Sequence, residues 1–480
     1  MKTYPVSQWL SEELPPERII VWGNHCISLS TFRQDVTALY LRLRNHTASR
    51  WALCFDDSYH FCVALLATLH AGKTPVIPGH CREAQLQEQQ SCFDGVLTDL
   101  PLKLSCPCWH ALPHQQDSIA PEAILSKTTL LKTTLSKTIP SKIILPHIAS
   151  DAALVIFTSG SSGMPKQVIK PVAMMDLEAQ WLASLWGNSL QSCVIRASVS
   201  HQHLYGLTFR IWLPMSLGLP FERKMVEFPE QFASRSQAPL THTPLARYAL
   251  ISSPAFLQRL DDTLPAPDCS FVVSAGGPLN FADAERVTQW INTIPNEIYG
   301  CTETGIMAWR TRKTDNTVWK AFPGVFFQKD EENNLRVYSP LLSASDGMVL
   351  DDQLLFDEQG NFSLLGRRDR LVKIEEKRIS LSEIERRLCT IDGIVDAAVL
   401  TINRGKRCHI GAVIVLDNET LKHYRQQGNR KFSQDWHRQL KPWLESVALP
   451  RYWRVVTAIP LNAQSKRSWP ELQELFNEPH

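Results

Sequence analysis

One stretch, Thr158-Ser159-Gly160-Ser161-Ser162-Gly163-Met164-Pro165-Lys166, has the composition of a phosphate-binding loop. Glycines let backbone N–H groups turn toward a bound anion, hydroxyl groups add donors, and one lysine supplies positive charge. The spacing differs from a Walker loop, because Lys166 follows Gly163 by three residues and precedes Gln167 instead of serine or threonine. A plain Ser/Gly turn would explain the hydroxyls but not the lysine. The stretch therefore predicts a loop that cradles the phosphates of ATP.

Three more short motifs contain groups that could bind a nucleotide or a carboxylate. Residues 200–207 read SHQHLYGL and contain an H-x-x-G pattern that starts at His203. Residues 274–279 read SAGGPL after an apolar run at 271–273, and their small side chains would let a flat ring lie against the backbone. Residues 299–303 read YGCTE. Each motif alone has an ordinary interpretation, because single histidine, tyrosine and glutamate residues most often pack in the core or face solvent.

Two further segments lie nearer the C-terminus. Residues 366–374 read GRRDRLVKI and continue through 378–385, and residues 459–466 read IPLNAQSK. Asp352 lies ten residues before Phe362. A carboxylate at such a position can accept hydrogen bonds from both hydroxyls of a ribose.

In this order along the chain, the motifs resemble the signature sequences of the AMP-forming adenylating superfamily. That superfamily contains acyl-CoA synthetases, aryl acid ligases, luciferases and peptide-synthetase adenylation domains, and the resemblance covers Thr158 to Lys466. It implies an AMP-forming acid–thiol ligase, in which ATP activates a carboxylic acid to an acyl-adenylate with release of pyrophosphate before transfer to a thiol. The implied cofactors are ATP and Mg²⁺. The implied acceptor is coenzyme A or the phosphopantetheine of an acyl carrier protein, which would then be a partner.

The resemblance also assigns roles to single residues. It implies that Lys466 bridges the carboxylate and the α-phosphate, that Thr302 lies near that phosphate, and that Glu303 binds Mg²⁺. His203 would lie at the acyl pocket, and the spacing from Pro460 selects Lys466 over Arg467. The implied ATP-binding residues are Thr158, Ser159, Gly160, Ser161, Ser162, Gly163, Lys166, Ala275, Gly276, Gly277, Tyr299, Gly300, Asp352 and Arg367.

A hinge and a thiol-tunnel loop are implied in the charged segment. The hinge is Asp369, and the loop contains Lys373, Glu376 and Arg378. Glu376 replaces the glycine usual in the family, and a bulky anion there could restrict the acceptor or favour a carrier protein over coenzyme A. Serine also replaces the usual glycine before Lys466. The sequence LDD at 350–352 replaces T-G-D, so Asp352 is preferred to Asp351 on spacing alone.

The chain loosely resembles the stand-alone acid ligases of bacterial aryl-polyene-type pathways, which load an aromatic acid. Candidates to line a pocket for an aromatic ring are His203, Tyr205, Cys301 and Trp309. Two alternatives stay open. The first is a free-standing amino-acid adenylation domain of nonribosomal peptide synthesis, and the second is a non-enzymatic adenylate-binding protein, which would have no need to keep Lys166, Glu303 and Lys466.

The elements that position these residues follow from the hydrophobic pattern. Residues 51–55 predict a strand, 59–70 a helix that stops at Ala71-Gly72, and 75–78 the next strand, which together predict an α/β fold with a mostly parallel sheet. Residues 152–157 predict a strand that leads into the phosphate loop. The resemblance implies a large N-terminal α/β domain, residues 1–365, and a small α+β C-terminal lid domain that is mobile, residues 366–480.

Composition excludes several classes of protein. The 480 residues are 44% apolar, enough for two or more domains, and the formal charge of +2 gives no reason to expect nucleic acid as a partner. No apolar run approaches the ~18 residues that span a bilayer, and the N-terminus has no secretory pattern. We expect a cytoplasmic protein without membrane insertion.

Two segments of unusual composition are interpreted without a functional site. Residues 106–110 read CPCWH, but the C-x-C spacing has no second half-site, which disfavours a metal centre. The cysteines are scattered along the chain and form no regular framework, so reduced thiols are expected. Residues 125–142 have a lysine at every fifth position, a period that fits neither helix nor strand, and a solvated connector is the favoured interpretation over a basic binding arm.

Overall fold

The computed structural model describes residues 2–112, 144–158, 166–233, 247–367, 370–374, 377–404, 407–444, 446–462 and 466–477. Packing divides the chain into two compact units. The first is Met1–Thr317 with Pro340–Ser343, and the second is Val318–Ser339 with Ala344–His480. The predicted domain boundary after residue 365 stays a prediction, because a unit defined by packing need not coincide with a body that moves.

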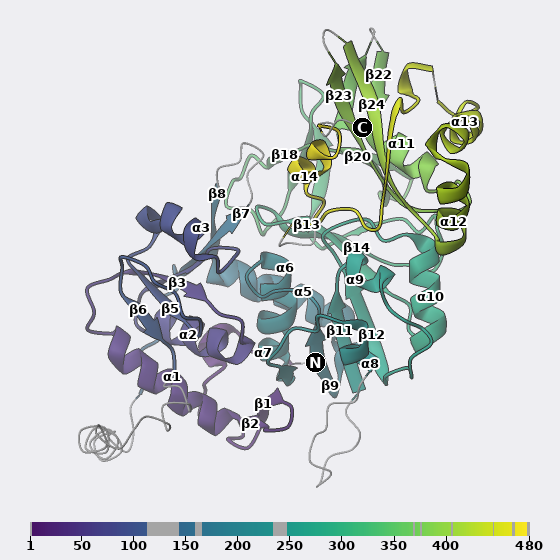
Figure 1. Cartoon of the computed structure of the whole chain (residues 1–480). Coiled ribbons are helices and arrows are strands. Elements are labelled where there is room, and N and C mark those ends of the chain that lie inside the picture. The colour runs from purple at the N-terminus through teal and green to yellow at the C-terminus, as the bar shows by residue number, and fades with distance from the viewer. Residues whose placement is uncertain are drawn as a thin grey trace, which may run out of the picture. The chain divides into compact units, whose positions relative to one another are not determined.

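The larger sheet of the first unit is parallel through its middle (Figure 1). Strands β13, β12, β11, β9, β10 and β1 run parallel to one another, β14 is antiparallel to β13, and β2 is antiparallel to β1. The strands that the first unit contributes are, in spatial order, β14 (Gly305–Thr311), β13 (Asn296–Cys301), β12 (Cys269–Ser274), β11 (Arg247–Ser252), β9 (Cys193–Ala197), β10 (Phe221–Glu222), β1 (Ile19–Trp22) and β2 (Ile27–Ser28).

A second sheet of the first unit contains the strand that leads into the phosphate loop. Its order is β6 (Cys108–His110), β5 (Gly95–Thr98), β3 (Arg50–Cys54), β4 (Thr74–Ile77), β7 (Ala153–Thr158) and β8 (Lys166–Pro171), with only β8 antiparallel to its neighbour. The predicted strand–helix–strand unit is confirmed within one residue at each end, as β3, α2 (Ser58–His70) and β4. Strand β3 is buried on both faces, as expected for a central parallel strand.

Helices cover the sheets of the first unit (Figure 1). The side chain of Asp57 caps α2 by accepting from the amides of Tyr59 and His60, and all but one of the helix's residues are buried. The remaining helices are α1 (Leu29–Leu43), α3 (Glu83–Glu88), α5 (Val172–Leu190), α6 (Leu204–Gly206), α7 (Leu213–Leu217), α8 (Pro229–Ala233), α9 (Pro254–Gln258) and α10 (Phe281–Ile291), with 3₁₀ turns η1 (Val6–Gln8) and η2 (Gln90–Cys92) and a π-helical turn η3 (Leu207–Trp212).

The second unit is built from smaller sheets, mostly antiparallel. Strands β23 (Ile394–Arg404) and β24 (Arg407–Leu416) form a long hairpin, and β25 (Tyr452–Val456) lies parallel to β24. The other strands are β15 (Lys320–Ala321), β16 (Phe326–Lys329), β17 (Leu335–Tyr338), β18 (Met348–Leu350), β19 (Asp352–Phe356), β20 (Phe362–Arg367), β21 (Leu371–Ile374) and β22 (Lys377–Ser380). The helices are α11 (Leu381–Leu388), α12 (Asn418–Gln427), α13 (Asn429–Leu440) and α14 (Trp469–Glu474), with a 3₁₀ turn η5 (Ser446–Ala448).

A hydrophobic core of its own stabilises the second unit. Leu388 of α11, Ala412 of β24 and Trp436 of α13 are all buried in one cluster. The side chains of Ser380 and Asp417 cap α11 and α12. The predicted fold class is confirmed: a large N-terminal α/β part with mostly parallel sheets is followed by a small α+β part. Among the described residues, no helix is both long enough and apolar enough to cross a bilayer.

Candidate active site

The two described ends of the predicted phosphate loop pair with each other. Thr158, the last residue of β7, is the cross-strand partner of Lys166, the first residue of β8. Ser159, Gly160, Ser161, Ser162 and Gly163 lie outside the described residues. Lys166 is exposed, and its Nζ lies 3.6 Å from Oε1 of Glu303. Two motifs that are far apart in the sequence are therefore brought together by the fold.

Glu303 lies in the turn of the β13–β14 hairpin. The turn is tight: a Cβ on Gly300 would lie 2.3 Å from the carbonyl oxygen of Gly305, and Gly305 has a φ of +71°. The hydroxyl of Thr304 accepts from the amide of Cys301 at 3.2 Å. Only glycine fits at position 300, which gives a physical reason for the glycine of the YGCTE motif. Tyr299, Thr302 and Glu303 are all at least partly exposed at this end of the hairpin.

Two charged residues that the sequence analysis missed lie behind this turn. Lys170 of β8 donates from Nζ to the carbonyl oxygen of Glu303 at 3.1 Å and to that of Leu341 at 3.4 Å. Glu178 of α5 accepts at Oε1 from the amide of Ile306 at 3.3 Å. Both side chains are only 2% exposed. The sequence pattern could have indicated that Glu178 is buried, because it falls on the same helical face as the apolar residues Met175 and Leu182.

Burial dominates the titration of this pair. It lowers the pKa of Lys170, with the charge of Glu178 acting in the opposite direction. It raises the pKa of Glu178 to about 7, against the opposing effects of Lys170 and the amide of Ile306. Each partner thus reduces the desolvation penalty of the other.

The H-x-x-G motif forms the start of a helix whose position is fixed by its glycine. His203 is the residue before α6, and a Cβ on Gly206 would lie 2.0 Å from the carbonyl oxygen of Ser200. The helix therefore packs directly onto the backbone that precedes it. The ring of His203 lies beside Gly79, where an added Cβ would be 3.6 Å from Cε1 of His203 and 3.4 Å from the carbonyl oxygen of Phe157. The motif is thereby placed next to the residue before Thr158.

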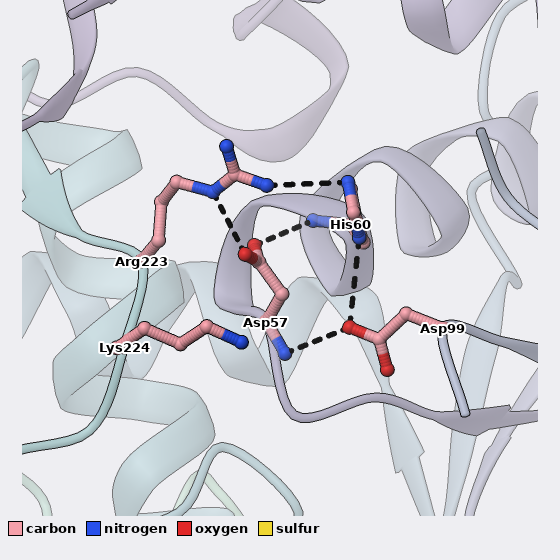
Figure 2. A pocket seen from close by; sticks show the side chains of 5 residues that line it. All are labelled: Asp57, His60, Asp99, Arg223 and Lys224. Atoms are coloured by element: carbon pink, nitrogen blue, oxygen red, sulfur yellow. Dashed lines mark hydrogen bonds and ion pairs between the residues drawn. The ribbon is translucent and has the colours of Figure 1, made fainter. Parts of the chain in front are cut away.

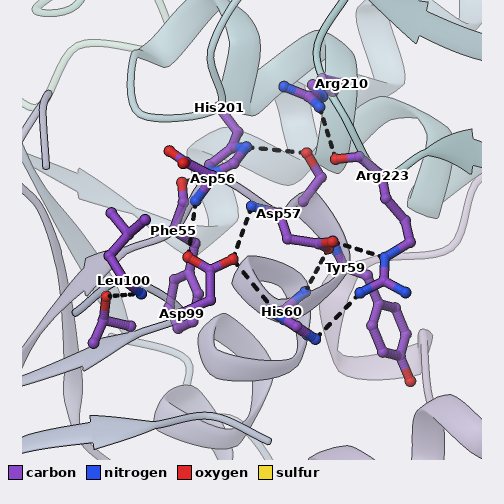
Figure 3. A network of polar contacts seen from close by, with 12 residues as sticks. Phe55, Asp56, Asp57, Tyr59, His60, Asp99, Leu100, His201, Arg210 and Arg223 are labelled. Carbon is purple, nitrogen blue, oxygen red and sulfur yellow. Dashed lines mark hydrogen bonds and ion pairs between the residues drawn. The ribbon is translucent and has the colours of Figure 1, made fainter. Parts of the chain in front are cut away.

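The two residues before His203 anchor the motif to the second sheet, and Figure 3 shows the first of them, His201. His201 is buried, with Nε2 2.9 Å from the carbonyl oxygen of Phe55 and Nδ1 3.0 Å from the hydroxyl of Ser58. Gln202 donates to the carbonyl oxygen of Leu53 at 2.9 Å. Since Leu53 lies in β3 and Phe55 follows its last residue, these bonds tie the motif to the end of that strand.

Tyr205 reaches the carboxyl ends of two parallel strands. Its hydroxyl lies 3.0 Å from the carbonyl oxygen of Ser252, at the end of β11, and 2.9 Å from that of Val273, in β12. Burial raises the pKa of Tyr205 well above its usual value, so the hydroxyl stays a donor. Ala275 to Gly277 follow β12 directly, and Gly276 has a φ of +94° with no atom within 4 Å of an added Cβ. The predicted adenine loop is an open turn at the carboxyl edge of the sheet, where ligands of α/β folds usually bind.

The four candidates for an aromatic-acid pocket have different surroundings. Trp309 of β14 packs edge-on against Trp186 of α5, with ring centroids 6.2 Å apart, and Trp186 also contacts Phe271 at 5.2 Å. Cys301 is the last residue of β13 and is exposed as a residue, although burial of its sulfur raises the pKa of the thiol. His203 directly precedes α6, and Tyr205 is the second residue of that helix. Whether these side chains contact an acid stays a prediction.

The second unit contains the predicted ribose-binding residues. Asp352, the first residue of β19, is the direct cross-strand partner of Arg367, the last residue of β20. Lys373 and Arg378 are likewise partners in the β21–β22 hairpin. Asp369 and Glu376 lie outside the described residues, as does the lysine-rich stretch 125–142.

Lys466 and Arg467 have opposite environments. Lys466 is exposed in a turn closed by a hydrogen bond of 2.7 Å from the amide of Asn462 to its carbonyl oxygen. Arg467 forms ion pairs with Glu385 at 3.0 Å and with Asp396 at 2.9 Å. Burial opposes the charge of Arg467, but these two carboxylates hold its pKa above the usual value. Arg467 is therefore held in place by two ion pairs, and the residue before it, Lys466, is exposed.

A separate cavity of about 460 Å³ in the first unit is lined by Asp57, His60, Asp99, Arg223 and Lys224 (Figure 2). Arg223 donates from Nε to Asp57 at 2.7 Å, and its NH2 lies 3.3 Å from Nε2 of His60. Burial acts against Asp99, yet hydrogen bonds from His60 and the amides of Asp56 and Asp57 hold its pKa below the usual value. The carboxylates of Asp57 and Asp99 already accept several hydrogen bonds. We therefore interpret this network as structural, with Arg223 linking α2 to the segment after β10.

Glu303 is the residue that fits a metal ion best. The described residues contain no group of three or more His, Cys, Asp or Glu side chains that could hold one. Mg²⁺, however, is commonly bound by one or two carboxylates together with the phosphates of a substrate. A single, partly exposed carboxylate beside the phosphate-loop lysine fits that mode of binding.

Comparison with known proteins bears on the family and on the fold. A family profile described as AMP-binding enzyme matches residues 10–327. The 4-coumarate–CoA ligase of Cereibacter sphaeroides is 24% identical over 253 residues, which cover 52% of this chain and 56% of that protein. The 4-coumarate–CoA ligase of Halorhodospira halophila is 25% identical over 320 residues, 66% of this chain and 75% of that protein.

A solved structure shows the fold over nearly the whole chain. ATP-bound MatB from Rhodopseudomonas palustris superposes with a TM-score of 0.76 at 18% identity and covers 99% of both chains. At this identity the likeness bears on the fold and not on the reaction. The chain matches little more than half the length of the Cereibacter relative.

Proposed function

Because the chain belongs to the AMP-binding enzyme family, we propose that it activates a carboxylic acid with ATP and then transfers the acyl group to a thiol. In the first half-reaction a carboxylate oxygen attacks the α-phosphorus, the bond to the β-phosphate breaks, and pyrophosphate leaves. In the second, the thiol sulfur attacks the acyl carbon, AMP leaves, and the thiol proton is released. The observation that carries the proposal is the 3.6 Å approach of Lys166 to Glu303.

Adenylation requires the protein to position the two reactants and to neutralise their charge more than to supply a nucleophile. Two anions must meet, so catalysis depends on neutralising the phosphates and holding the carboxylate in line with the α-phosphorus. Lys166 and the phosphate-loop hydroxyls would hold the departing pyrophosphate, and Glu303 would hold Mg²⁺. Mg²⁺ supplies positive charge to the phosphates when it is bound.

Lys466 is our candidate for the residue that bridges the carboxylate and the α-phosphate. The proposal is supported by its exposure on a turn, next to an arginine that is committed to two ion pairs. The second unit would supply Lys466 in the first half-reaction. A rearrangement about Asp369 would then present the segment from Lys373 to Arg378 to the thiol.

An aromatic acid is the substrate that we propose. The curated relatives named above are 4-coumarate–CoA ligases. The first unit also contains the aromatic residues Tyr205 and Trp309, which are candidates to line a pocket for an aromatic ring. Coenzyme A or a carrier-protein phosphopantetheine would be the acceptor, and Glu376 is the residue that we propose restricts the choice.

The test begins with a screen for pyrophosphate release across aryl, fatty and amino acids with ATP and Mg²⁺. We expect turnover with aryl acids, and turnover with amino acids alone would favour a peptide-synthesis adenylation domain instead. Lys466→Ala should lower acid-dependent ATP–pyrophosphate exchange by ~10²- to 10³-fold, the usual effect of losing one charged donor to a transition state. Thiol transfer from a supplied acyl-adenylate should survive in that variant.

A matched control is Lys422→Ala, which removes another exposed lysine of the second unit, in α12. It should leave both half-reactions unchanged. Unaltered adenylate formation in Lys466→Ala would show that the assignment of Lys466 is wrong.

A further inference from the structure

The buried pair behind the Glu303 turn has no role in the reaction described so far. Lys170 and Glu178 are each 2% exposed, and side chains of these types are rarely so buried. The two groups interact electrostatically, and replacing buried opposite charges by apolar residues of similar volume is often neutral or stabilising. Stability alone is therefore a weak explanation for charges at these two positions.

The contacts of the pair are directed at one short piece of backbone. Lys170 donates to the carbonyl oxygen of Glu303, and Glu178 accepts from the amide of Ile306. These two groups lie on either side of Thr304 and Gly305, so β8 and α5 hold the turn at both ends. A Cβ on Gly305 would lie 3.5 Å from Oε2 of Glu178 and 2.9 Å from Leu341, which shows how closely the turn packs.

Strand β8 contacts Glu303 at two points. Lys166 lies 3.6 Å from its carboxylate, and Lys170 donates at 3.1 Å to its carbonyl oxygen. The two lysines are four positions apart, an even number, so both project from the same face of the strand. Lys166 thus contacts the carboxylate of Glu303, and Lys170 contacts its backbone carbonyl group. The position of the backbone determines where the side chain of Glu303 starts.

We propose that Lys170 and Glu178 are positioning residues that fix the backbone of the Glu303 turn and thereby the direction in which the Glu303 carboxylate meets the magnesium nucleotide. This inference rests on the proposed function. It predicts an effect on nucleotide and metal handling, and none on recognition of the acid. A misplacement of about 1 Å at such a group can lower a rate by ~10²-fold.

The experiment uses the full-length double variant Lys170→Met/Glu178→Gln. Changing both residues removes both charges at similar volume and leaves no unpaired buried charge. Calorimetry measures ATP binding over a series of Mg²⁺ concentrations, and pyrophosphate exchange gives kcat and the KM values. We expect the Mg²⁺ concentration for half-maximal ATP binding to rise at least tenfold, and kcat to fall by ~10- to 100-fold. The KM for the acid should stay within twofold of the wild-type value.

A matched control lies on the same hairpin, away from the turn. Glu297 and Arg310 are cross-strand partners of β13 and β14, form an ion pair of 2.7 Å, and are largely buried. Arg310→Met/Glu297→Gln should lower Tm without changing the Mg²⁺ dependence of ATP binding. If it shifts that dependence as much as the Lys170/Glu178 variant does, the positioning role is wrong and the effect is one of general hairpin stability.

Two outcomes separate this inference from the proposed function. If the Lys170/Glu178 variant binds ATP with the wild-type Mg²⁺ dependence, the inference is wrong whatever the reaction is. If the wild-type protein shows no exchange with any acid, the proposed function fails, and the binding comparison still decides on Lys170 and Glu178. Should the double variant not fold, Lys170→Met alone carries the same binding test, because it removes the donor to the carbonyl oxygen of Glu303 and keeps Glu178.

Discussion

At the scale of single residues, His201 shows how a buried histidine can hold a functional neighbour in place. Nε2 faces the carbonyl oxygen of Phe55, so this nitrogen carries the proton, and Nδ1 accepts from the hydroxyl of Ser58. Burial, followed by the charge of Arg210, lowers the pKa of His201 well below its usual value. Burial therefore favours the neutral ring in the folded protein, and protonation would place a charge in the core and reverse the hydrogen bond with the Ser58 hydroxyl.

This shift predicts a pH dependence of stability. The unfolded chain binds a proton at His201 below its ordinary pKa of ~6.5, whereas the folded chain does not, so the free energy of unfolding should fall as pH drops below that value. The loss per pH unit is at most ~1.4 kcal/mol for one histidine. Urea unfolding at pH 8, 7, 6 and 5 measures it.

His201→Gln is the comparison for that prediction. It should be less stable than the wild type at pH 8, with a shallower decline toward pH 5. Some decline should remain, because burial also lowers the pKa values of His70 and His80. Equal slopes for the two proteins would contradict the role assigned to His201.

At the scale of elements, the turn after β12 offers a clean test of the adenine loop. A Cβ on Gly277 would meet only Pro254, at 3.9 Å, so the fold has room for a methyl group there. If an adenine ring lies flat against this backbone, the same methyl group would lie in its path. We expect Gly277→Ala to raise the KM for ATP about tenfold, equivalent to ~1.4 kcal/mol, without lowering Tm.

The control for that loop is the neighbouring glycine. Gly276 has a φ of +94°, so Gly276→Ala should lower Tm through backbone strain even without a ligand. A wild-type KM for ATP in Gly277→Ala would remove Ala275 to Gly277 from the nucleotide site. Thermal unfolding and pyrophosphate exchange on the same preparations separate the two effects.

The local hydrophobic pattern of the sequence predicts some secondary-structure elements, but not the contacts that depend on how distant segments pack. The segment β3–α2–β4 and the strand before the phosphate loop were predicted within a residue or so, because their apolar runs are bounded by clear turn residues. The pairing of Asp352 with Arg367 was not, since cross-strand register depends on how two distant segments pack. Lys170 was missed for a related reason: a lysine reads as exposed unless the fold supplies buried carbonyl groups for it.

At the scale of the whole molecule, the predicted site residues are divided between two compact units. The phosphate-loop lysine, His203 and Glu303 belong to the first, and Asp352, Arg367 and Lys466 belong to the second. The sequence indicated both sets by their order, but order alone does not say how the units are oriented. A reaction in two steps that needs Lys466 only in the first step requires that orientation to change.

Asp369→Pro tests whether a backbone rotation at the predicted hinge allows this change. Proline fixes φ near −65° and restricts the preceding residue, so it should favour one arrangement of the units. We expect one half-reaction to stay near wild type and the other to fall by ~10²-fold, a loss typical of misplaced reacting groups. Pyrophosphate exchange measures the first, and AMP release from supplied acyl-adenylate with thiol measures the second. Asp369→Ala, which leaves φ unrestricted, should retain both. Parallel losses in the proline variant, or none, would exclude Asp369 as the hinge.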